Sequence, residues 1–126
     1  MRASTLWISL ASALGALGVA LGAFGAHALR ERLAAEQLAS WATAVQYQLI
    51  HSAALLALGL FAAASSRPVA LPASLFAAGI LLFSGSIYLL VLTQQRWLGP
   101  VTPLGGLCFI AGWLSLLVLL RSPSPS

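Results

Sequence analysis

Five small residues on one face of the first apolar stretch constrain the fold more than any other feature of the chain. Ala11, Gly15, Gly18, Gly22 and Gly25 follow one another at spacings of four, three, four and three residues. On an α-helix this spacing removes side chains from one face, so that a second helix can approach almost to backbone contact. Each glycine costs about 1 kcal/mol of helix propensity relative to alanine, so these residues require a packing partner. We call these five residues the glycine seam, and it predicts a helical bundle.

Charged residues are rare and widely spaced. Of the 126 residues, 60% are hydrophobic and 6% are charged, and the mean hydropathy is +0.98. These values are typical of integral membrane proteins and not of soluble domains. The charges leave four uncharged windows of 27, 30, 28 and 24 residues, and a spanning helix needs roughly 20. We therefore expect an all-α membrane bundle of four transmembrane helices, forming a single domain over residues 1–121.

The four spans are placed at about residues 5–27, 46–64, 73–93 and 104–120. Between the first two, residues 29–45 carry leucine and tryptophan on one helical face and charged residues on the other. This pattern predicts an amphipathic helix in the membrane interface, although a solvated N-terminal extension of the second span agrees equally well with it. Residues 122–126 alternate Ser and Pro and are expected to be a disordered tail.

The first stretch also resembles a secretory signal, because Arg2 precedes an apolar run and Ala26-His27-Ala28 resembles a cleavage site. A signal peptide has an apolar core of about 7 to 15 residues, which is much shorter than this uncharged window. A glycine seam would also have no use in a discarded segment. We expect the stretch to be retained as the first span.

The arginines are spread over both predicted ends of the bundle. An even number of spans places both ends of the chain on one side, with Arg2, Arg67 and Arg121 there and Arg30, Arg32 and Arg96 on the other. The positive-inside rule therefore leaves the orientation open. The net charge of +4 is dispersed and not gathered in a stripe, so we expect membrane lipids and no nucleic acid as partners.

The chain contains no Asp, Asn or Lys. A Ser-His-Asp relay, a Schiff-base lysine, a phosphate-loop lysine and a carboxylate-rich calcium site are therefore excluded. His27, His51 and Cys108 do not have the helical or turn spacing of metal ligands. We expect no enzyme, no catalytic residue, no cofactor and no metal site.

Polar residues in the second and third spans form the candidate polar cluster. It comprises Tyr47, His51, Ser84 and Tyr88. Because His51 and Ser84 are almost equally far along the chain from the turn at Arg67, antiparallel packing places them at similar depth. His51 is therefore predicted to lie within reach of Ser84 or Tyr88. A structural hydrogen bond and a proton-carrying role remain alternatives for His51.

Several short motifs occur in a characteristic order along the chain. They are Gly22-Ala-Phe-Gly-Ala-His-Ala-Leu29, Trp41-x-Thr-Ala-x-x-Tyr-Gln48 leading to His51, Leu82-Phe-Ser-Gly-Ser-x-Tyr88, Leu92-Thr93, Thr102-Pro-Leu-Gly-Gly106 and Gly112-Trp113. In these motifs the chain resembles the YgdD family, filed as domain of unknown function 423. The resemblance implies a small multi-pass protein of the bacterial inner membrane without an established activity, and the tail after Arg121 carries none of the motifs.

Two functional hypotheses from different classes follow. The first is a small membrane protein that acts by binding or packing against lipid or another membrane protein. The alternative is a small transporter or channel that works as a homo-oligomer, although both glutamates lie outside the predicted spans. Proton-coupled transport normally uses an ionisable group within a span, which leaves His51 as the only candidate.

Overall fold

The computed structural model describes residues 2–121, so the predicted disordered tail at 122–126 lies outside the described residues. All regular elements in this part of the chain are helical. They are α1 (Ala3–His27), α2 (Ala35–Ser65), α3 (Ala70–Gly79), the π-helical turn η1 (Ile80–Gly85), α4 (Ser86–Thr93), the short 3₁₀ helix η2 (Arg96–Leu98) and α5 (Val101–Arg121). The elements α3, η1 and α4 follow one another directly and form one long helix, Ala70–Thr93, which we call the third helix.

Within residues 2–121, four helices are long and apolar enough to cross a membrane. They correspond to the four uncharged windows of the sequence, and the all-helical prediction is confirmed. The bounds differ most in the second, because α2 begins at Ala35 and not near residue 46. The Gln37 side-chain oxygen accepts a hydrogen bond from the Ala34 backbone N–H at 3.0 Å, which helps to start the helix there.

Residues 29–45 do not form a separate interfacial helix in the described chain. Leu29 to Leu33 form turns, and residues 35–45 are the first three turns of α2. No proline or glycine occurs between Ala35 and Leu58, so nothing in the sequence breaks the helix at the predicted boundary. Of the two alternatives for this segment, the structure therefore agrees with the N-terminal extension of the second span.

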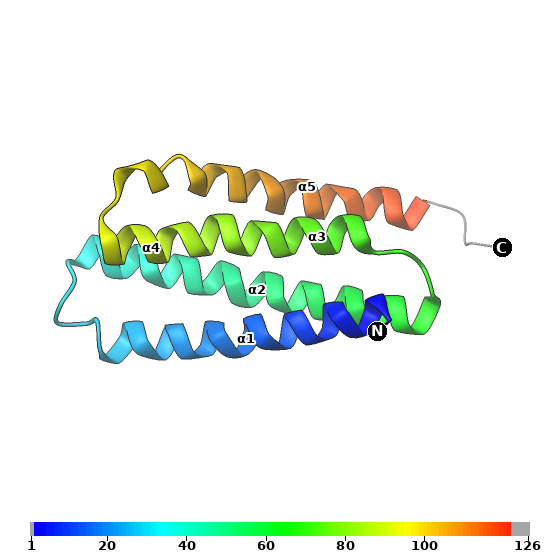
Figure 1. Ribbon diagram of the computed structural model, residues 1–126, viewed down its shortest axis with the longest axis horizontal. Helices are drawn as coiled ribbons and strands as arrows, with labels where there is room; N and C mark the ends of the chain where they lie inside the picture. Colours follow the sequence, from blue (N-terminus) through cyan, green and yellow to red (C-terminus); the bar gives the residue numbers. More distant parts are fainter. Residues whose placement is uncertain (1, 122–126) are drawn as a thin grey trace.

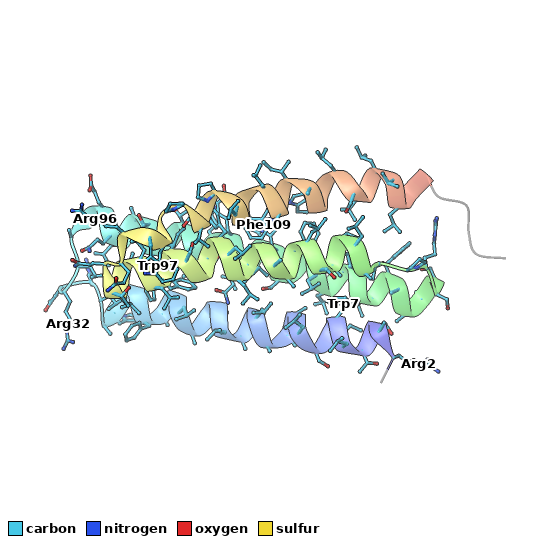
Figure 2. The ribbon with its side chains drawn as sticks, turned by 45° about the horizontal axis from the view of Figure 1, so that its top comes forward. Arg2, Trp7, Arg32, Arg96, Trp97 and Phe109 are labelled. Carbon is cyan, nitrogen blue, oxygen red and sulfur yellow. The ribbon has the colours of Figure 1, made fainter. Side chains whose placement is uncertain are left out.

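The helices lie in the order α1, α2, third helix and α5, and each runs antiparallel to the next (Figure 1). The beginning of α1 and the end of α5 lie at one end of the molecule, as the even number of spans predicts (Figure 1). Figure 2 shows Arg2 at this end and Arg32, Arg96 and Trp97 at the other. Charged side chains thus gather at the two ends, where the surfaces of a membrane would be.

Four of the five residues of the glycine seam lie at the contact between α1 and α2. Ala11, Gly18 and Gly25 are buried, and a Cβ atom on Gly22 would lie 3.2 Å from Val45. Gly15 differs, because a Cβ atom there would meet no atom within 4 Å. At about 100° per residue, Gly15 lies about 60° around the helix from Gly18 and at the edge of the contact face. The spacing alone did not distinguish this position from the others.

The third helix and α5 interlock through glycines and phenylalanines. Gly79 faces the ring of Phe109, and a Cβ atom on Gly112 would lie 2.7 Å from the ring of Phe76. Gly105 is packed still more closely, because a Cβ atom there would overlap the backbone of η1 at Phe83. This close approach fixes α5 against the third helix at the level of the π-helical turn.

Candidate functional site

The structure separates the candidate polar cluster into two groups. His51 is buried, with 5% of its surface exposed, and its Nδ1 atom lies 2.8 Å from the Tyr47 carbonyl oxygen. Trp113 on α5 donates its indole N–H to His51 Nε2 at 3.0 Å. A carbonyl only accepts and an indole N–H only donates, so these two bonds together select the neutral Nδ1–H tautomer of His51. The imidazole ring also stacks on Phe109, with ring centroids 3.7 Å apart.

Ser84 and Tyr88 bond elsewhere on α2. The Ser84 hydroxyl donates to the Ala44 carbonyl at 2.7 Å, and the Tyr88 hydroxyl donates to Gln48 Oε1 at 2.7 Å. The predicted contact of His51 with Ser84 or Tyr88 is therefore wrong. His51 lies instead beside Phe76, with ring centroids 5.5 Å apart, about 12 Å along the helix from the level of Ser84.

The segment between α2 and α3 explains this error. Ser66 has a left-handed backbone (φ 59°) that ends α2, and residues 66–69 then lead to the start of α3. Val69 is buried in one cluster with Leu55 and Leu58, so the connection has returned alongside α2 before α3 begins. The end of α2 therefore projects beyond the start of α3 (Figure 1). Equal distance along the chain from Arg67 does not place residues at equal depth.

Gln48 joins three helices at the centre of the bundle. Its side chain is 1% exposed, and its Nε2 atom donates to the Leu14 carbonyl of α1 at 2.8 Å. Its Oε1 atom accepts the bond from Tyr88 on α4. The Ser52 hydroxyl donates to the Gln48 backbone carbonyl at 2.6 Å. Both ends of the amide are therefore satisfied in a position from which water is excluded.

The tryptophan one heptad earlier repeats this arrangement. Trp41 donates its indole N–H to the Leu21 carbonyl at 2.8 Å, just as Gln48 donates to the carbonyl of Leu14. In each case the residue four positions after the acceptor is a glycine, Gly25 or Gly18. The side chain at that position normally leans back over the carbonyl. The glycine seam thus exposes backbone carbonyls of α1 as hydrogen-bond acceptors, in addition to allowing close approach.

The buried polar side chains of the core are all hydrogen-bonded. Among the side chains that the structure describes, every buried nitrogen or oxygen atom has a hydrogen-bond partner. In the same residues, no three His, Cys, Asp or Glu side chains lie close enough to share a metal ion. The arrangement of the core side chains therefore connects helices to one another, and these groups would have to give up existing bonds to act on a ligand.

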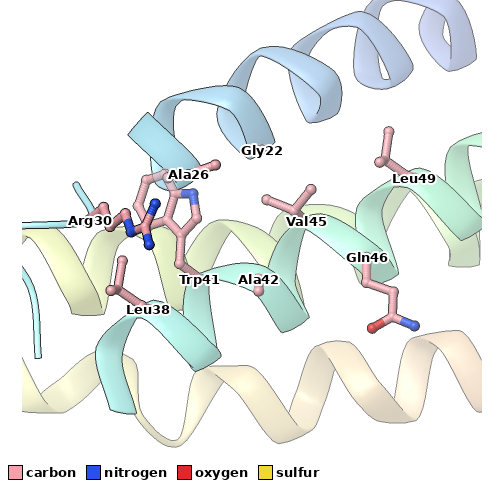
Figure 3. A pocket seen from close by; sticks show the side chains of 10 residues that line it. Gly22, Ala26, Arg30, Leu38, Trp41, Ala42, Val45, Gln46 and Leu49 are labelled. Atoms are coloured by element: carbon pink, nitrogen blue, oxygen red, sulfur yellow. The ribbon is translucent and has the colours of Figure 1, made fainter. Parts of the chain in front are cut away.

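A groove of about 620 Å³ opens between α1 and α2 on the outside of the bundle. Its lining is mainly apolar, with Arg30 as the one charged residue: Gly22, Gly25, Ala26, Arg30, Leu38, Trp41, Ala42, Val45, Gln46 and Leu49. Figure 3 shows Arg30 and Leu38 at one end of the groove and Leu49 at the other. The groove has the size of small-molecule sites, which is roughly 300–1,000 Å³.

The residues that make the central contacts were not predicted from the sequence. Gln48, Trp41 and Trp113 were not proposed as site residues, and Arg30 was considered only as a surface charge. A signal for two of them was present, because Trp41 and Gln48 are seven residues apart, the same separation as Gly18 and Gly25. No comparable signal linked Trp113 to its partner His51, because the two residues are 62 positions apart in the chain.

Comparisons with known proteins agree with the resemblance found in the motifs. Residues 21–106 match the family described as "Protein of unknown function (DUF423)". A UPF0382 membrane protein of Staphylococcus haemolyticus is 42% identical over 113 residues, covering 90% of this chain and 93% of the relative. The UPF0382 membrane protein YwdK of Bacillus subtilis is 42% identical over 120 residues, covering 90% of this chain and 94% of the relative. No solved structure matches the chain.

Proposed function

The chain belongs to the DUF423 family of membrane proteins, and from this premise we propose that it binds lipid within the bilayer and carries out no chemistry. The relatives are bacterial proteins named only as membrane proteins, so the argument for lipid depends on the features of this chain. We also assign the protein to the bacterial inner membrane as a multi-pass protein. The relatives' bacterial origin supports this assignment.

The length of α2 supports a lipid-binding site near the surface of one leaflet. At 1.5 Å per residue, its 31 residues are about 46 Å long, whereas the hydrocarbon core is about 30 Å thick. The excess belongs to the first turns, where Glu36, Gln37 and Ser40 lie. Residues 35–45 would therefore occupy the interfacial region as the beginning of α2.

The open groove between α1 and α2 is the observation that carries the proposal. Gly22 and Gly25 leave space on α1, and exposed Ala26 and Ala42 keep the opening wide. The opening lies on the outside of the bundle, so an acyl chain could enter sideways from the bilayer without crossing a polar barrier. Apolar walls suit an acyl chain, because methylene groups there would contact protein atoms at close range.

A small oligomeric transporter or channel is the alternative. The observation that favours it is the low burial of the two outer spans, since 17% of the most apolar window of each is buried, which leaves surface for a second copy. The satisfied polar core weighs against it. A polar path through this bundle would require Gln48 or His51 to exchange its present partners for water or an ion.

The proposed function can be tested by counting bound lipid. We expect Ala42→Leu, which fills the groove from an exposed position, to lower the number of phospholipids retained by the purified protein in native mass spectrometry. Ala39→Leu is the matched control, because Ala39 is an exposed alanine on the same helix that does not line the groove. Equal lipid retention by the two variants and the unmodified protein would contradict the proposal.

A further inference from the structure

We infer that the groove between α1 and α2 is selective for anionic phospholipids, and that Arg30 binds the lipid phosphate. This inference rests on the proposed function, because it assigns a headgroup to the lipid whose acyl chain occupies the groove. Arg30 is the only charged residue among the ten that line the groove. The other lining residues could not distinguish one headgroup charge from another.

The Arg30 side chain is available for a ligand. It is exposed, and within residues 2–121 its guanidinium group makes no hydrogen bond or ion pair. Glu36, the acidic residue of the nearby turn of α2, lines a separate hollow together with Gln37, Ser40 and residues of α4. Glu36 is thus on another side of α2, and neither it nor Glu31, the residue that follows Arg30, lines the groove.

The position of Arg30 along the groove matches the headgroup level of one leaflet. From Leu38 to Leu49 the groove follows twelve residues of α2, and the eleven steps between them rise about 16 Å. This is about half of the roughly 30 Å hydrocarbon core. Arg30 lies at the end near the loop and Leu49 at the inner end (Figure 3). A lipid with its phosphate at Arg30 would therefore extend its chain toward Leu49 and the bilayer centre.

The chemistry of the guanidinium group specifies the headgroup class. Arginine presents a planar fork of N–H donors that bonds two phosphate oxygens at once. In phosphatidylcholine the quaternary ammonium partly neutralises the phosphate and weakens its attraction to the arginine. In phosphatidylglycerol the headgroup has no positive charge, so the full negative charge of the phosphate attracts the arginine. Phosphatidylglycerol is therefore the class of lipid that the groove fits.

The test compares two phospholipids with the same acyl chains on the purified full chain in detergent. By titration in native mass spectrometry, we expect dioleoylphosphatidylglycerol to bind about fivefold more tightly than dioleoylphosphatidylcholine, the effect of one arginine at a membrane surface. Arg30→Gln should abolish this preference while the phosphatidylcholine affinity stays the same. Arg32→Gln is the control, because Arg32 is an exposed arginine of the same loop outside the groove.

The outcomes separate this inference from the proposed function. If Ala42→Leu lowers the binding of both lipids but Arg30→Gln leaves the preference intact, the groove binds lipid and the assignment of Arg30 is wrong. If Arg32→Gln has the same effect as Arg30→Gln, general surface charge and not the groove selects the headgroup. If glycerol phosphate without acyl chains competes as well as the phospholipid, the ligand is a soluble phosphate. If Ala42→Leu changes neither affinity, the proposed function itself fails.

Discussion

Gln48 shows how a buried amide can hold a membrane bundle together. Its amide group has one donor bonded to the Leu14 carbonyl and its oxygen bonded to the Tyr88 hydroxyl. In hydrocarbon an amide without partners is costly, because water cannot replace the missing bonds. The two bonds join α1 to the third helix through α2. A single side chain thereby links elements that lie far apart in the sequence.

Replacing Gln48 should weaken the bundle more than replacing a neighbouring glutamine. We expect Gln48→Leu to lower the free energy of unfolding by about 1 to 2 kcal/mol, because interhelical hydrogen bonds in membranes contribute about 0.6 kcal/mol each and at most about 1.7. Tyr88→Phe, which removes one of the two bonds, should cost about half as much. The measurement is unfolding by sodium dodecyl sulfate in mixed micelles, followed by circular dichroism. Gln46→Leu is the control, since Gln46 is exposed, and an equal loss there would exclude a special role for Gln48.

At the scale of elements, glycines have two different uses in this bundle. Between α1 and α2 they expose the backbone carbonyls that Trp41 and Gln48 bond, and they make room for the side chains of Trp41 and Leu49. Between the third helix and α5, Gly105 allows direct backbone contact with η1. The π-helical turn is completed by Ser86, whose hydroxyl lies 2.5 Å from that of Thr102 on α5 and donates to the Phe83 carbonyl at 3.0 Å. The close approach of α5 to the third helix and the π-helical turn η1 therefore occur at the same level of the bundle.

Two adjacent glycines of α5 provide a matched test of this contact. Gly105→Ala would place a methyl group against the backbone of Leu82 and Phe83. We expect it to lower the free energy of unfolding by about 1 to 3 kcal/mol, the usual cost of overpacking. Gly106→Ala should be neutral or slightly stabilising, because its Cβ atom would come no nearer than 4.0 Å to Phe83 and alanine favours the helix. Thermal unfolding in detergent measures both, and similar melting temperatures would show that the helices are not in backbone contact at Gly105.

At the scale of the whole molecule, the two inner spans provide the core and the two outer spans face outward. The most apolar windows of α2 and the third helix are 33% and 39% buried, about twice the 17% of the outer spans. The buried polar residues accordingly lie on the inner spans: Gln48, His51, Ser52, Ser84 and Ser86. Large apolar side chains such as Leu17 and Val118 are exposed on α1 and α5, where a bilayer would solvate them.

The arrangement of the helices predicts which loops share a side of the membrane. In a variant in which Cys108 is replaced by alanine, a membrane-impermeant thiol reagent should label Ala3→Cys and Ser66→Cys from one side. The same reagent should label Glu31→Cys and Gln95→Cys only from the other side, because these loops lie at the opposite end (Figure 1). Labelling of Ser66→Cys and Glu31→Cys from the same side would contradict the four-span topology.

Features that depend on local composition and length could be predicted from the sequence. The uncharged windows predicted four membrane helices. Their even number predicted that the first span begins and the fourth span ends on the same side, and the motifs identified the family. These features do not depend on how the helices meet. A helix crosses a membrane because its own residues are apolar and its own backbone hydrogen bonds are satisfied.

The pairing of the polar residues, in contrast, depends on how the helices pack against one another. The return of residues 66–69 alongside α2 shifts the third helix by about two turns, and no pattern within either helix records this shift. Tyr88 consequently bonds Gln48. His51 accepts a hydrogen bond from Trp113 of α5, a helix for which no contact with His51 was predicted. The groove beside Arg30 also depends on helix packing, because it forms only when α1 and α2 pack with a particular offset along their axes. Side-chain hydrogen bonds act over about 3 Å, so they depend on a register that helical periodicity leaves open.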